Sequence, residues 1–156
     1  LNATDKSSLL IDYFEDRWSD LDAFQRDVPG GIFGYREMAD IALAYRRAGN
    51  QARFEEAMIR LEEVIGQSLS DGIQGHSLLI SLAAYHALAG AHDQARVRLA
   101  EAIDSGWITA AKISKEYPYF RELDGNPEYE AIQARMIEHI NREREKLDLP
   151  AVPASI

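Results

Sequence analysis

Four histidines are the residues of this chain best suited to chemistry. His86 and His92 lie on either side of Gly90, while His76 and His139 stand alone. Imidazoles can bind zinc, but protein zinc sites are built from His and Cys ligands at short, regular spacings. The chain has no cysteine and no His-x-x-x-His pair. We therefore expect structural histidines, with no metal and no cofactor.

Adjacent carboxylates are the second candidate for chemistry. Glu55–Glu56 and Glu62–Glu63 could act as general acids and bases if they faced a substrate. They fall on the polar faces of expected helices, where solvated charges are the simpler interpretation. No nucleophile–base pair is apparent beside them, so we predict no catalytic residues and a protein that is not an enzyme.

Composition limits the classes of partner. The chain has 156 residues, 46% of them hydrophobic, and a formal net charge of −9. This size fits one domain with a real core. The negative charge repels phosphate backbones and anionic lipids, so we expect no contact with nucleic acid or membrane. The chain starts at Leu1, and we expect a longer parent, cytoplasmic by preference or periplasmic if membrane-anchored.

The elements that position these residues are predicted to be helices. Apolar residues recur every three or four positions, and strand-like alternation is scarce. We predict an N-terminal helix over residues 5–28, a helical hairpin over 32–67 and a second hairpin over 76–105. Within the hairpins, the helices are expected at about 32–48, 52–67, 76–89 and 93–105, and residues 68–75 form a turn-rich link.

Two similar sequence motifs mark the hairpins. Each begins with an alanine, has Tyr45 or His86 three residues later, and ends at Gly49 or Gly90. Glycine at this place suits the left-handed C-terminal cap of a helix. Small residues on the facing helices permit close approach; these are Ala42, Ala57, Ala83 and Ala95.

The remaining residues, 107–149, are predicted to form a C-terminal cap. A brief helix is expected over 107–113, followed by an aromatic turn at 117–120. Asn126 and Pro127 form a strong helix start as N-cap and first residue. The last helix is predicted to reach Leu147, with a frayed tail over 149–153. Its apolar stripe is Tyr129, Ile132, Met136, Ile140 and Leu147.

The two hairpin motifs resemble the tetratricopeptide repeat. The second motif matches the family pattern at Leu79, Leu82, Ala83, His86, Gly90, His92, Ala95, Leu99 and Ala102. The first matches at Met38, Ile41, Ala42, Tyr45, Gly49, Phe54, Ala57, Leu61 and Val64. The spacing from Gly49 to Gly90 exceeds the usual period of roughly 34 residues. The resemblance implies an all-α, right-handed array of antiparallel hairpins with capping helices.

A narrower resemblance concerns the C-terminal part. Its sequence around Gly106–Trp107 and Asn126–Pro127 is similar to the end of repeat regions in bacterial multidomain regulators. Those parents include adenylate or guanylate cyclases and winged-helix regulators, in which the repeats close the chain. This resemblance implies a regulatory module of a larger bacterial signalling protein.

In the repeat family, the first helix of each hairpin lines a concave groove. The groove positions are, in this sequence, Arg36, Ala39, Leu43, Arg46, Arg47, Ser77, Ile80, Ala84, Ala87 and Leu88. Three arginines thus share one helix face beside an apolar strip on the next helix. They either pair with nearby acids or receive an acidic partner segment that has an apolar anchor.

The resemblance implies a non-catalytic module for protein–protein interaction or intramolecular regulation. Its partner would be a protein or peptide segment, or another domain of the same chain. The alternative is a sensory domain that binds a small ligand in the concave groove. An enclosed apolar pocket with converging polar groups would favour the sensor.

Overall fold

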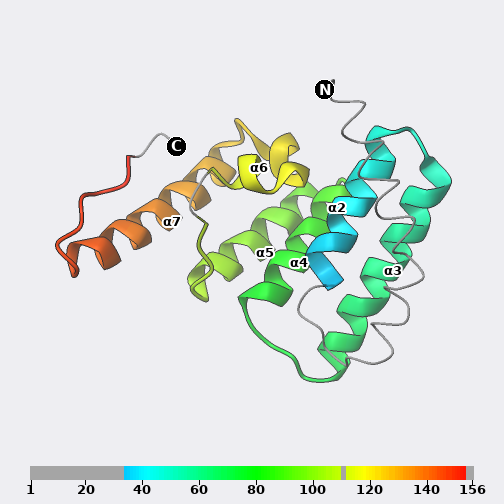
Figure 1. Ribbon diagram of the computed structural model, residues 1–156, viewed down its shortest axis with the longest axis horizontal. Coiled ribbons are helices and arrows are strands. Elements are labelled where there is room, and N and C mark those ends of the chain that lie inside the picture. Colours follow the sequence, from blue (N-terminus) through cyan, green and yellow to red (C-terminus); the bar gives the residue numbers. More distant parts are fainter. Residues whose placement is uncertain (1–33, 110–111, 154–156) are drawn as a thin grey trace. The chain divides into compact units, whose positions relative to one another are not determined.

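The computed structural model describes residues 34–109 and 112–153. In these residues every regular element is a helix, and there is no strand. The expected all-α class is confirmed for these residues. The predicted N-terminal helix, over residues 5–28, lies outside them. The helices are drawn in Figure 1. The chain divides between Gln74 and Gly75 into two compact units.

In its described residues, the first unit contains one pair of packed helices, α2 (Gly34–Arg47) and α3 (Gln51–Ser70). The three-residue connection between them forces the second helix to return along the first. The residues buried between and around the pair include Met38, Ile41, Ala42, Tyr45, Ala57, Leu61 and Ile65. Most of the positions at which the first motif matches the repeat pattern are therefore buried, while Phe54 and Val64 are half-buried.

Gly49 ends α2 in the predicted left-handed conformation, with a φ of 72°. The following Asn50 N–H donates to the Tyr45 carbonyl oxygen at 3.0 Å, which closes the helix end. The Asn50 side chain then accepts a hydrogen bond from the Arg53 N–H and caps the start of α3. One short turn thus stops one helix and starts the next.

Helix α3 is longer than predicted. It continues through Ser68, Leu69 and Ser70, which the sequence analysis assigned to the link. Inside the helix, the Ser70 hydroxyl donates to the Gln67 carbonyl oxygen at 2.8 Å. The polar composition that indicated a turn is therefore compatible with a last helical turn, and the helix stops only before Asp71–Gly72.

The second unit is built on α4 (His76–Leu88) and α5 (His92–Asp104), which pack against each other. Gly90 joins them with a φ of 75°, as predicted. Both alanines expected at this interface, Ala83 and Ala95, are fully buried. Helix α4 is apolar around most of its circumference, which is typical of a helix covered on several sides.

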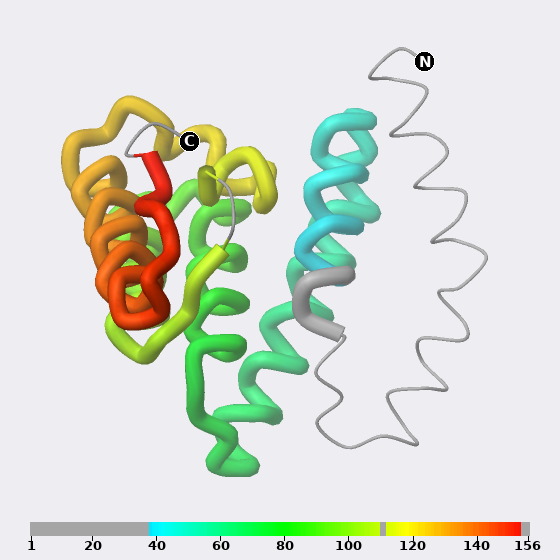
Figure 2. Tube along the Cα trace, turned by 60° about the vertical axis from the view of Figure 1, so that its left-hand side comes forward, coloured from blue at the N-terminus to red at the C-terminus, as the bar shows by residue number. Residues whose placement is uncertain are grey.

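The C-terminal segment covers this hairpin in two places. The 3₁₀ helix η1 (Pro118–Leu123) packs against α4, and α7 (Pro127–Glu145) packs against α5 (Figure 2). Aromatic side chains fill the space beneath; the buried ones are Trp107, Tyr117, Tyr119, Phe120 and Tyr129. Neighbouring rings contact one another edge-on, as Trp107 and Tyr117 do at 5.4 Å between centroids.

The prediction of a brief helix over 107–113 is wrong. Residues 107–109 are not helical, and α6 (Ile113–Glu116) begins only after residues 110–111, which lie outside the described ranges. Two tertiary contacts explain the course of the chain. Trp107 is buried against Tyr117, and the buried Thr109 hydrogen-bonds Glu116. These long-range contacts outweigh local helix propensity.

The start of α7 is as predicted. The Asn126 side chain accepts hydrogen bonds from the N–H groups of Glu128 and Tyr129, with Pro127 in the first helical turn. Its predicted apolar stripe is correct only in part, because the helix ends at Glu145 and Leu147 is 69% exposed. Helix α7 packs against α5, whereas Leu147 lies in the turn beyond the helix.

The tail over 149–153 is not frayed. It runs back beside the last turns of α7 (Figure 2). The Asn141 side chain donates to the Val152 carbonyl oxygen at 3.0 Å and accepts from the Val152 N–H at 2.7 Å. The Arg144 Nε donates to the Pro150 carbonyl oxygen at 2.6 Å. The tail is held by side chains eleven and six residues away, which a local reading of the sequence could not reveal.

Candidate functional site

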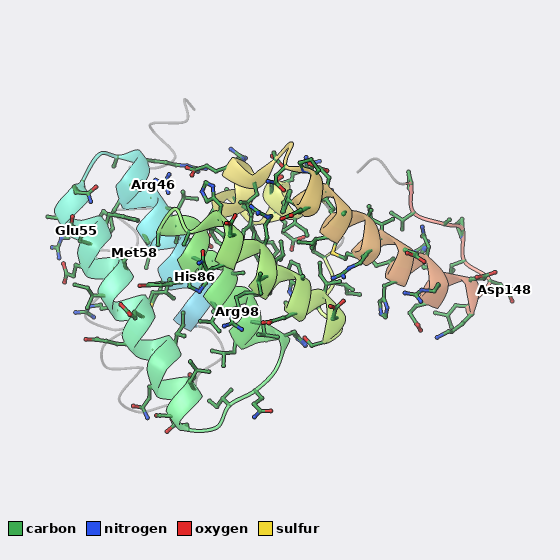
Figure 3. The ribbon with its side chains drawn as sticks, turned by 180° about the vertical axis from the view of Figure 1, so that it is seen from behind. Arg46, Glu55, Met58, His86, Arg98 and Asp148 are labelled. Carbon is green, nitrogen blue, oxygen red and sulfur yellow. The ribbon has the colours of Figure 1, made fainter. Side chains whose placement is uncertain are left out.

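The predicted partner-binding residues of α2 are partly exposed. Arg46 lies in its last turn (Figure 3), as does Arg47, and both side chains are exposed, whereas Leu43 is half-buried. Ala39 is only 1% exposed and belongs to the core. Arg36 is part of α2, but its side chain is outside the described part. The two arginines also suit the negative end of the helix dipole.

The predicted apolar strip on α4 is largely covered. Ile80 is 8% exposed, and Ala84, Ala87 and Leu88 are also buried, which leaves Ser77 as the exposed position of this set. A partner therefore finds little apolar surface on these four side chains. Helices α2 and α4 belong to different units, so the two sets of residues are described separately.

His86, His92 and His139 are half-buried, and His76 is exposed at the start of α4. The His86 ring lies edge-on to Tyr85 at 5.6 Å, with Arg98 of α5 nearby (Figure 3). Burial and the positive charge of Arg98 hold the pKa of His86 below its usual value. The His92 Nε2 atom lies 3.3 Å from Glu122 Oε2, which links α5 to η1. Among the described residues, no cluster of three His, Asp or Glu side chains has an arrangement suited to a metal ion.

A polar cluster that the sequence analysis missed joins α6 to α7. Lys112 Nζ lies 3.0 Å from Asp124 Oδ1 and 3.6 Å from Glu130 Oε1. The Ser114 hydroxyl donates to Asp124 Oδ1 at 2.8 Å, beside the buried Tyr129.

The protonation states in this cluster suit a structural role and not proton transfer. The hydrogen bond to Asp124 raises the pKa of Lys112, so the ammonium group stays protonated and cannot act as a base. Burial raises the pKa of Tyr129 and keeps its hydroxyl neutral. The cluster therefore acts as a clasp between α6 and the first turn of α7. No local motif announces it, because Lys112 and Asp124 are brought together only by the fold.

A groove lies along the second half of α7. It encloses about 640 Å³ between the helix and the tail. Its lining residues are Ala134, Ile137, Glu138, Asn141, Arg142, Glu145, Asp148, Leu149 and Ala151. All belong to the second unit. The sequence analysis missed this groove because one of its walls is the tail, which was expected to be frayed.

No described helix is both long enough and apolar enough to cross a lipid bilayer. No family model matches the sequence, and neither a curated protein nor a solved structure is significantly similar to it. The resemblance to tetratricopeptide repeats thus stays a prediction.

Proposed function

We propose that this chain is a non-catalytic interaction module of the tetratricopeptide type within a larger bacterial signalling protein. The partner is a peptide segment or a neighbouring domain that presents acidic residues. The observation that carries this proposal is the joint exposure of Arg46 and Arg47 at the end of a hairpin helix. Bidentate pairing with carboxylates is the interaction that guanidinium groups make best.

Two further features support the proposal. The helices of each pair meet through fully buried alanines, such as Ala57 and Ala83, and both pairs turn at a left-handed glycine. Repeat arrays with this construction usually present a surface rather than a reaction centre. The net charge of −9 also means that an acidic peptide is repelled by most of the protein. Specific binding of such a peptide would therefore require a local basic patch, such as the one formed by Arg46 and Arg47.

A labelled synthetic peptide of glutamates around a single leucine provides the test. We expect it to bind the full chain, with affinity that falls as salt is added. The double variant Arg46→Glu/Arg47→Glu should bind about tenfold more weakly, because close charge pairs contribute to affinity and their reversal adds repulsion. Fluorescence anisotropy measures both effects.

The matched control is Lys115→Glu/Arg121→Glu, which makes the same change in net charge at exposed positions of the second unit. It should leave peptide affinity nearly unchanged. Equal weakening by both double variants would mean that the peptide responds only to overall charge, and the proposed site on α2 would be wrong. Circular dichroism of each variant verifies that the helices are intact.

A further inference from the structure

The groove on α7 has one wall of unusual construction. The tail that forms it is fixed through its backbone, since Asn141 and Arg144 bond only to main-chain atoms of Pro150 and Val152. The chain reverses at Asp148, which has a φ of 54° and lies just beyond α7 (Figure 3). The wall is therefore a defined part of the second unit, although it contributes few side chains to the core.

Four of the residues that line the groove are apolar. Ile137 and Ala134 come from α7, and Leu149 and Ala151 come from the tail. Leu149 is 46% exposed, and the adjacent Leu147 is 69% exposed. Two large apolar side chains are thus left in water beside an apolar depression, an arrangement typical of surfaces that bind a partner.

Charge decides what kind of partner fits. The ionisable residues that line the groove are Glu138, Arg142, Glu145 and Asp148. Three carboxylates against one guanidinium leave the lining negative, and the whole chain carries a net charge of −9. A cationic segment gains from both the local rim and the long-range field, whereas an acidic segment loses from both.

We propose that this groove is a second binding site, specific for a short cationic peptide segment that carries one large apolar side chain. The apolar anchor lies on Ile137 between α7 and the tail, and flanking lysines or arginines meet Glu138, Glu145 and Asp148. A volume of about 640 Å³ accommodates one such anchor and the adjoining backbone. This site is independent of the one proposed on α2, and it selects the opposite charge.

The test uses the full chain and a labelled synthetic peptide of lysines around a single leucine. We expect saturable, salt-sensitive binding by fluorescence anisotropy. The variant Glu138→Lys/Glu145→Lys should weaken it about tenfold, because two attractive charges become repulsive. The matched control is Glu62→Lys/Glu63→Lys on α3, which makes the same change in net charge at exposed positions of the first unit. It should weaken binding less than about twofold.

A second variant tests the role of the tail. Asn141→Ala removes both hydrogen bonds to Val152 and should weaken peptide binding several-fold, because the groove loses a fixed wall. Tighter binding by Asn141→Ala would overturn the proposal, since it would show that the tail occupies the site rather than forming it.

Three other outcomes would also overturn it. The first is the absence of binding to the unmodified chain. The second is equal weakening by the two double variants, which would reveal attraction to net charge alone. The third is a dimer of the unmodified chain, seen by sedimentation velocity, that dissociates in Glu138→Lys/Glu145→Lys. That result would assign the groove to a second copy of this chain. The acidic peptide that tests the α2 site has no part in these measurements, so the two proposals fail separately.

Discussion

His86 occupies a position where packing, rather than proton chemistry, sets its behaviour. Its ring contacts the ring of the adjacent Tyr85 edge-on. Burial and the nearby Arg98 lower its pKa, so the ring is neutral near pH 7. A neutral imidazole is a flat, weakly polar group that can stand in for a small aromatic ring between helices.

At the same scale, Ala83 sets how closely α4 and α5 approach. It is fully buried, as is Ala95 of the facing helix. We expect Ala83→Leu to lower the free energy of unfolding by roughly 1–3 kcal/mol, because added methylene groups have no space in a packed interface. Urea unfolding measures the change.

The control for this substitution is Ala131→Leu, the same replacement at an exposed position of α7. It should change stability by less than about 0.5 kcal/mol, as surface substitutions usually do. Similar losses at Ala83 and Ala131 would contradict the close helix contact assigned to Ala83.

At the scale of elements, α7 depends on a defined start. The Asn126 side chain accepts from the N–H groups of Glu128 at 3.0 Å and Tyr129 at 3.2 Å. Asn126→Ala removes the acceptor for both groups and should cost about 1 kcal/mol of stability. Thermal or urea unfolding, followed by circular dichroism, measures this loss.

Asn126→Asp keeps an acceptor and adds a negative charge at the positive end of the helix. It should be at least as stable as the unmodified chain near pH 7. If the aspartate variant loses as much as the alanine variant, the side-chain bonds are not what stabilises this helix end.

At the scale of the whole molecule, the second unit needs its C-terminal segment. Helices α4 and α5 bury their outer faces beneath η1 and α7, with Trp107, Phe120 and Tyr129 between them. A chain that ends after Ser105 should aggregate or lose cooperative unfolding, because these faces would be exposed to water. Size-exclusion chromatography and a thermal melt make the measurement.

A chain that ends after Asp148 is the matched truncation. It removes only the tail, which three hydrogen bonds from Asn141 and Arg144 hold on α7. This shorter chain should remain folded and soluble. A soluble, cooperatively folding product of the longer truncation would refute the capping role of residues 107–149.

The sequence by itself determined the class of the described residues and the positions of the main helices. The spacing of apolar residues predicted the main helices, and Gly49, Gly90 and Asn126 predicted three of their ends. These signals succeed because helix periodicity, left-handed glycine caps and N-caps depend on atoms a few residues apart. Arg46 and Arg47, expected on an open helix face, are exposed, whereas Ala39, expected on the same face, is buried.

Only the tertiary structure decided features that join distant residues. The extended course at Trp107 depends on Tyr117, the clasp at Lys112 depends on Asp124, and the tail depends on Asn141. Likewise, the burial of Ile80 on α4 depends on what covers that helix, and not on its own periodicity. Each of these contacts stabilises the protein only after the helices have assembled. Local sequence therefore carries no signal for them, and the groove on α7 could not be foreseen.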